Sequence, residues 1–256
     1  MGTWICHLRI AENLLTHWPE LDEVAFTFGN IAPDSGVPNA DWTAFDPPKE
    51  VTHFLKLGED EGRVKDLDFY RGYLTDLALQ LDRARYSFVL GYFCHLVCDN
   101  LWWKLIAKAT MSIYAELYTQ LGRAMFSDVK DDWYGLDQCY VRDQPDCLFW
   151  RVFLTAPYPP AYLPFIPSAA LHHQFDYIRK FYSQPDPAWV LDRPYPYLNQ
   201  ATMDRFVADA TSAIISICAR SAELRQLTDT HTALALLAAH QVAPYAAPIG
   251  DDQWWR

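Results

Sequence analysis

Glycine is scarce in this sequence, at 10 of 256 residues. Tight turns between strands depend on glycine, so the shortage weighs against an all-β protein. No run of about 18 uncharged apolar residues occurs, which excludes a transmembrane helix. Basic residues are also few, since 21 Lys and Arg stand against 32 Asp and Glu for a net charge of −11. A field of this sign repels phosphate backbones, so we expect no bulk binding of nucleic acid.

The N-terminal sequence lacks the features of an export signal, because His7 and Arg9 stand where the apolar centre of a signal peptide would lie. No small-residue cleavage site follows them. The cysteines lack the spacing of a disulfide framework: they are Cys6, Cys94, Cys98, Cys139, Cys147 and Cys218. We therefore expect reduced thiols in a cytoplasmic protein.

What the sequence does contain is apolar residues at helical spacing. Hydrophobic residues make up 51% of the chain and charged residues 21%, which excludes a disordered protein. The helical pattern covers residues 4–17, 19–28, 69–81, 86–121, 168–182, 202–227 and 228–242. We therefore predict an all-α protein in which residues 1–256 form a single multi-helix domain.

Three stretches interrupt this helical pattern. The prolines and glycines of residues 29–48 favour a long ordered loop, and loops of that length in compact domains are often functional. Residues 128–146 are polar and aromatic, and a short apolar helix follows them. Residues 157–167 are rich in proline and form a stiff connector.

His95 and Asp99 stand in a segment, residues 86–103, that is apolar on all sides and therefore typical of a central buried helix. Residues four apart share one helix face, with roughly 6 Å between their Cβ atoms, so both side chains can reach one metal ion. Burying a carboxylate and an imidazole is costly unless they pair or bind a metal. A His–Asp hydrogen bond within the core is the structural alternative for this pair.

Three further residues strengthen the metal hypothesis. Asp34 follows Pro33 in the loop of residues 29–48, where a restrained backbone could hold a carboxylate. His53 begins the next segment, and His7 lies on the apolar side of the first predicted helix and so faces inward. A lone inward histidine is usually a core residue, whereas three histidines with two carboxylates in apolar surroundings suit zinc.

Four short motifs span about the first 105 residues: WxxHxxIA from Trp4, GNIAPD ending at Asp34, THF around His53, and LGYFxHxxxD ending at Asp99. Together, and in this order, they resemble the zinc-dependent phospholipase C family. The rest of the chain resembles an uncharacterised hydrolase branch of that family more than its secreted phospholipases.

The resemblance implies an all-helical fold and a zinc site of one to three ions, with two favoured. Asp34, His53, His95 and Asp99 would hold one zinc ion, and His7 would hold a second, with Asp99 bridging the two. Asp34 would also be the catalytic residue that orients or deprotonates the attacking water. Paired metals would lower the pKa of a bound water and neutralise charge on the phosphoryl oxygens.

Two departures from the family concern the outer ligands. The secreted enzymes ligate the second metal through the amine and carbonyl of an N-terminal tryptophan, whereas Trp4 lies three residues into this chain. Their third zinc uses a histidine six residues after the bridging aspartate, where this chain has Leu105. Substitute ligands for a third site are His172, His173, Asp176, Asp132 and Asp137. Each has a solvated helix face or a loop cap as its structural alternative, so a site of one or two metals is the prediction.

These inferences predict an enzyme, a zinc-dependent phosphoester hydrolase. Its substrate would be a small-molecule phosphoester or a phospholipid headgroup, and phosphate neutralisation would depend mainly on the metals because Lys and Arg are few near the motifs. A zinc-dependent nuclease is the closest enzymatic alternative, although the net charge of −11 disfavours it. A non-catalytic helical protein stabilised by zinc would keep the ligands but lack an open coordination position.

Overall fold

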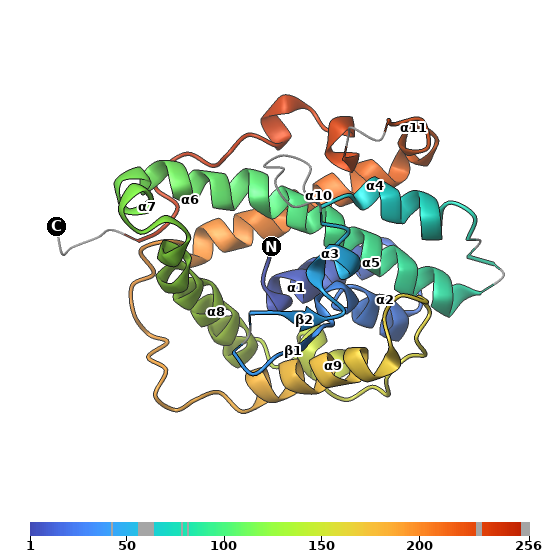
Figure 1. The fold of residues 1–256 in the computed structure, drawn as a ribbon, viewed down its shortest axis with the longest axis horizontal. Coiled ribbons are helices and arrows are strands. Elements are labelled where there is room, and N and C mark those ends of the chain that lie inside the picture. Colours follow the sequence, from blue (N-terminus) through green and yellow to red (C-terminus); the bar gives the residue numbers. More distant parts are fainter. Residues whose placement is uncertain (42, 56–63, 78, 81, 229–231, 252–256) are drawn as a thin grey trace.

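Helices make up most of the chain in the computed structural model (Figure 1), which confirms the predicted all-α class. The structure describes residues 1–41, 43–55, 64–77, 79–80, 82–228 and 232–251. The longer helices are α1 (Trp4–His17), α5 (Arg83–Trp102), α8 (Met125–Asp143), α9 (Ser168–Ser183) and α10 (Gln200–Ala219). None of the described helices combines the length and apolarity that a bilayer crossing requires.

Shorter elements connect these helices. The short α-helices are α2 (Glu23–Gly29), α3 (Lys49–Thr52), α4 (Asp66–Phe69), α6 (Lys108–Ile113), α7 (Ala115–Leu121) and α11 (Ser221–Leu224). Single turns of 3-10 or π geometry are η1 (Ala32–Asp34), η2 (Tyr70–Leu74), η3 (Trp103–Ala107), η4 (Gly122–Ala124), η5 (Phe149–Phe153), η6 (Ala233–Leu236) and η7 (Ala239–Gln241).

Helix α5 lies at the centre of the structure, and α1, α2, α4 and α10 pack around it (Figure 1). Every residue from Ser87 to Trp102 is buried, as predicted for a helix that is apolar on all sides. The single helix predicted over residues 86–121 is divided, because η3, α6 and α7 follow α5 with a non-helical residue at Tyr114.

Helix α2 crosses α5 with the two backbones in direct contact. Gly29 on α2 lies against the carbonyl of Phe88, and Gly91 on α5 lies against the carbonyl of Phe26. A Cβ at either glycine would collide with backbone atoms, so this approach requires the absence of a side chain. The crossing brings the segment after α2 within hydrogen-bond distance of His95.

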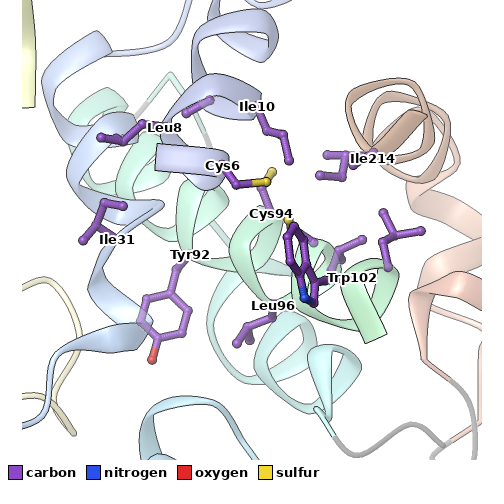
Figure 2. Packing of buried hydrophobic residues seen from close by; sticks show 14 of the residues in the cluster. Cys6, Leu8, Ile10, Ile31, Tyr92, Cys94, Leu96, Trp102 and Ile214 are labelled. Carbon is purple, nitrogen blue, oxygen red and sulfur yellow. The ribbon is translucent and has the colours of Figure 1, made fainter. Parts of the chain in front are cut away.

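The hydrophobic core beneath this crossing is built from several helices. Figure 2 shows Leu8 and Ile10 of α1, Leu96 and Trp102 of α5 and Ile214 of α10, and all five side chains are buried. Removing such surfaces from water supplies the main favourable term of folding. All six cysteines are free.

The loop predicted over residues 29–48 contains short regular elements. It begins with η1, and the strands β1 (Val37–Pro38) and β2 (Phe45–Asp46) then pair in antiparallel fashion. A strand of two residues tolerates a proline, because little of the hydrogen-bond ladder is lost at an edge.

Residues 128–146 were not among the predicted helices, but most of them form α8. Aspartates lower helix propensity, but Val129, Trp133 and Leu136 bury one face at helical spacing. The buried carboxylates of Asp132 and Asp137 accept hydrogen bonds from residues outside the helix, which offsets their desolvation.

The helix predicted over residues 228–242 is wrong in the part of that range that the structure describes. The turns η6 and η7 are separate and are joined by extended residues. The Ala233 amide donates to buried Asp66, and the Leu236 carbonyl accepts from Arg220. These tertiary hydrogen bonds replace the helical ones, while residues 229–231 of the prediction lie outside the described residues.

Candidate metal centre

The five predicted site residues converge from separate elements. His7 projects from α1, and Asp34 ends η1. His53 is the C-cap of α3, and His95 and Asp99 lie one turn apart on α5. The four residues other than Asp34 are buried, and the Asp34 side chain is 11% exposed.

Asp99 is at the centre of this cluster. Its Oδ1 lies 3.4 Å from His7 Nε2, and its Oδ2 lies 3.4 Å from His95 Nε2 and 3.6 Å from His53 Nε2. The Oδ1 of Asp34 lies 3.3 Å from His53 Nε2. Most N–H···O hydrogen bonds are shorter than this. Two ligand atoms that are each about 2.0–2.1 Å from a tetrahedral zinc ion lie roughly 3.3 Å apart, so the separations suit a shared ion.

Hydrogen bonds outside the cluster orient two of its imidazole rings. His95 Nδ1 donates to the Asn30 carbonyl over 2.7 Å, because a carbonyl can only accept. This bond directs Nε2 of His95 toward Asp99. His53 Nδ1 lies 3.1 Å from the Thr52 hydroxyl. An outer hydrogen bond of this kind fixes the tautomer and orientation of a metal-binding histidine.

Buried polar atoms without a hydrogen-bond partner are concentrated in this cluster. Within the described part of the chain they include Nε2 of His7, His53 and His95 and Oδ2 of Asp99. Each unsatisfied buried group destabilises the fold by about 1–3 kcal/mol. A divalent cation among them would satisfy all four atoms at once, so the residues present fit a metal ion.

The ligand atoms form two overlapping groups. His7, His95 and Asp99 make up one group, and Asp34, His53 and His95 make up the other, with the atoms of each within 4.8 Å of one another. His95 is the shared residue here, whereas the family resemblance assigned the bridge to Asp99. The two oxygens of Asp99 nevertheless face different histidines, so the cluster could hold one ion or a pair.

Burial and the charges of the cluster set its protonation states. Burial lowers the pKa of His7 to about 4 and also lowers the pKa of His53. For His95, burial opposes the charge of Asp99, and the net effect is a raised pKa. Burial alone would raise the pKa of Asp34 and Asp99, but hydrogen bonds and charges of the histidines hold both below the usual carboxyl range. Neutral imidazoles and ionised carboxylates are the forms that bind a divalent cation.

Two contacts of the cluster were missed in the sequence because they are made by backbone atoms. One is the Asn30 carbonyl described above, and the other is the Gly2 amide, which donates to Asp99 Oδ1 over 2.9 Å. A Cβ at Gly2 would lie only 3.1 Å from His7 Nε2, so glycine allows this approach. Trp4 instead packs its ring among aromatic side chains that include Tyr134.

The structure gives no support for a third metal site among the candidate ligands named from the sequence, which are His172, His173, Asp176, Asp132 and Asp137. Asp132 already pairs with Arg193. Asp137 accepts hydrogen bonds from the hydroxyls of Thr3 and Tyr182. None of these candidates joins a group of three potential ligands in the residues that the structure describes, so they stay alternatives without geometric support, and the predicted site of one or two metals does not need them.

A cavity of about 430 Å³ opens beside the cluster. Asp34 lines it together with the N-terminal segment and residues of α8. In Figure 1 the N-terminus accordingly lies near the middle of the molecule, beside α1. The cavity gives water and a small molecule a route to the least buried member of the cluster.

No protein-family model, curated protein or solved structure matches this chain. The resemblance of its four motifs to the zinc-dependent phospholipase C family therefore remains a prediction. The evidence for the candidate metal centre is therefore the identity of its five residues and the distances between their ligand atoms.

Proposed function

We propose that the protein is a metal-dependent hydrolase of phosphoesters and that its metal is zinc. One observation carries this proposal: Asp34 contacts the ligand cluster through His53 and also lines the cavity. Structural zinc sites are closed, whereas catalytic sites keep a position open to water and substrate. Three imidazoles and two carboxylates form a donor set that suits zinc, and the motif resemblance supports the same metal.

Asp34 is the residue that we expect to act on water. Zinc, when bound, would supply a Lewis acid that lowers the pKa of water and neutralises charge on a phosphoryl group. Asp34 is ionised and is the least buried residue of the cluster, so it can accept a hydrogen bond from a water molecule in the cavity and orient it. The metal would be held by the buried residues of the cluster, which are His7, His53, His95 and Asp99.

The size and composition of the cavity favour a small-molecule phosphoester. Its volume of about 430 Å³ lies in the usual range for small-molecule sites. A nuclease would need a basic groove along which a strand could lie, and the net charge of −11 disfavours one. The six free cysteines favour a reducing, cytoplasmic location.

Elemental analysis and turnover assays on one preparation test the proposal. Protein purified without added metal should contain zinc and should hydrolyse 4-nitrophenyl phosphate or bis(4-nitrophenyl) phosphate. Chelation should abolish turnover, and added zinc should restore it. Stoichiometric zinc without turnover on either ester would favour the non-catalytic alternative. Faster hydrolysis of single-stranded nucleic acid than of small esters would favour the nuclease.

A further inference from the structure

The cavity beside Asp34 contains two lysines that the metal hypothesis leaves without a role. Lys49 is on α3, where its carbonyl accepts the backbone hydrogen bond of His53, and Lys130 is on α8. Partial desolvation, and then the charge of Lys49, lower the pKa of Lys130. Both lysines thus line the same cavity as Asp34.

Neither lysine forms an ion pair with an acidic side chain in the described part of the chain. The interaction recorded for the Lys49 ammonium is with the ring of Phe45, whose centroid lies 5.4 Å from Nζ. This occurs in a chain with 32 acidic residues and only 21 basic ones. Two unpaired cations that repel each other across one cavity favour a bound anion, because the anion would relieve that repulsion.

The remainder of the cavity wall is mainly apolar and aromatic. It includes Trp103, Ala107, Met111, Tyr118, Phe126 and Trp133. The buried indole N–H groups of Trp103 and Trp133 have no acceptor in the described part of the chain. A wall of this kind with a few charged groups is typical of a site for a small amphipathic ligand.

We propose that Lys49 and Lys130 bind the oxygens of a dianionic phosphoryl group while the aromatic wall holds the organic group attached to it. The substrate is then a phosphomonoester of an aromatic or short apolar alcohol. This inference rests on the proposed function and narrows its substrate class. A monoester carries one more negative charge than a diester, and charge-assisted hydrogen bonds from two lysines distinguish the two. The lysines thus share the phosphate neutralisation that the sequence assigned mainly to the metals.

Binding of non-hydrolysable phosphonates to the zinc-loaded full chain tests this inference without turnover. Phenylphosphonate is the dianionic probe, at a pH above its second ionisation. Methyl phenylphosphonate keeps the ring but has one charge, and methylphosphonate keeps both charges but lacks the ring. Calorimetry should show that phenylphosphonate binds at least about tenfold more tightly than either of the other two.

Lysine variants separate the charge effect from binding to zinc. Lys49→Met and Lys130→Met keep most of the side-chain length and remove the charge. Each should weaken phenylphosphonate about tenfold and methyl phenylphosphonate much less, and the double variant should abolish the preference. The control Lys180→Met changes an exposed lysine on α9 that does not line the cavity, and it should bind all three probes as the wild type does.

The aromatic wall is tested in the same way. Phe126→Leu should reduce the preference for phenylphosphonate over methylphosphonate, with zinc content unchanged. Wild-type affinity for phenylphosphonate in both lysine variants, or no binding of this probe at all, would overturn the inference. If phenylphosphonate binding depends on the lysines but the protein hydrolyses no phosphoester, the anion site is supported and the proposed hydrolase is refuted. Turnover that is insensitive to both lysines would support the proposed hydrolase and refute the anion site at the lysines.

Discussion

The imidazole rings of His7 and His95 lie almost parallel, with their centroids 3.7 Å apart and 9° between their planes. Two protonated rings would repel each other strongly at this distance, and after burial the charge of His95 is the next cause that lowers the pKa of His7. Both rings present Nε2 to Asp99, each to a different carboxylate oxygen. Burial and the stack therefore both favour the neutral form of His7, in which a ring nitrogen has a lone pair that a cation can bind.

Asp99→Asn should release the metal and abolish turnover together. The amide has nearly the same shape and can still accept the hydrogen bond of Gly2, but it offers the three histidines one oxygen and no charge. Elemental analysis should show at least a tenfold loss of zinc per chain. Asp176→Asn, at an exposed position on α9, is the matched control and should keep its zinc. Full zinc content in Asp99→Asn would refute the central position of this carboxylate.

Asp34→Asn should reduce turnover more than it reduces zinc content. The Asp34 carboxylate lies at the cavity and contacts the cluster through His53, so its loss removes the group that orients water while four ligands remain. We expect a fall in kcat of about a hundredfold or more, which is the usual scale of general-base catalysis. Parallel loss of metal and turnover would make Asp34 a ligand without a further role.

Gly91→Ala should destabilise the protein and weaken zinc binding. The new Cβ would contact the carbonyl of Phe26 and the side chain of Asn30, so α2 must move away from α5 and take the acceptor of His95 Nδ1 with it. We expect a loss of roughly 2 kcal/mol in the free energy of unfolding. Gly72→Ala is the control, because a Cβ there meets nothing within 4 Å, and it should be neutral or slightly stabilising. Equal effects of the two substitutions would contradict the close crossing.

Asp137 should make stability fall as the pH rises. Burial raises the pKa of its carboxyl to about 7, although the hydrogen bonds from the hydroxyls of Tyr182 and Thr3 act in the opposite direction. The unfolded-state value is about 4, so between these pH values the folded chain binds a proton that the unfolded chain does not. Stability contributed by the protonated carboxyl is therefore complete below about pH 4 and is lost by about pH 7.

Asp137→Asn should remove this pH dependence, because an amide cannot ionise and can still bond both hydroxyls. Relative to the wild type, the metal-free variant should gain roughly 2 kcal/mol of unfolding free energy between pH 5 and pH 8. Denaturant titrations of both proteins at the two pH values measure this difference. If the difference in unfolding free energy between the two proteins is the same at pH 5 and pH 8, the Asp137 carboxyl titrates normally.

The sequence predicted the parts of the site that depend on local spacing. His95 and Asp99 share a face because the helix repeat requires it, and the all-round burial of α5 follows from its composition. The presence of Lys49 and Lys130 in one cavity was not predictable, since α3 and α8 are far apart in the chain and their residues reach this cavity only in the folded structure. The carbonyl of Asn30 was missed because backbone atoms carry no residue-type signal.

The errors in secondary structure have the same origin. Helix α8 forms against the propensity of its aspartates because Asp132 and Asp137 find partners elsewhere in the fold. The alanine- and leucine-rich segment from Ala233 onward does not become one helix, because Asp66 holds the first amide of its first turn. Hydrogen bonds between distant residues outweigh local preference in both cases.

Diffraction data collected at the zinc absorption edge from crystals of protein purified without added metal test the central claim most directly. The account predicts an anomalous peak within about 2.3 Å of Nε2 of His53 or His95 and of a carboxylate oxygen of Asp34 or Asp99. An empty centre, with these nitrogens and oxygens bonded only to water or to each other, would contradict it.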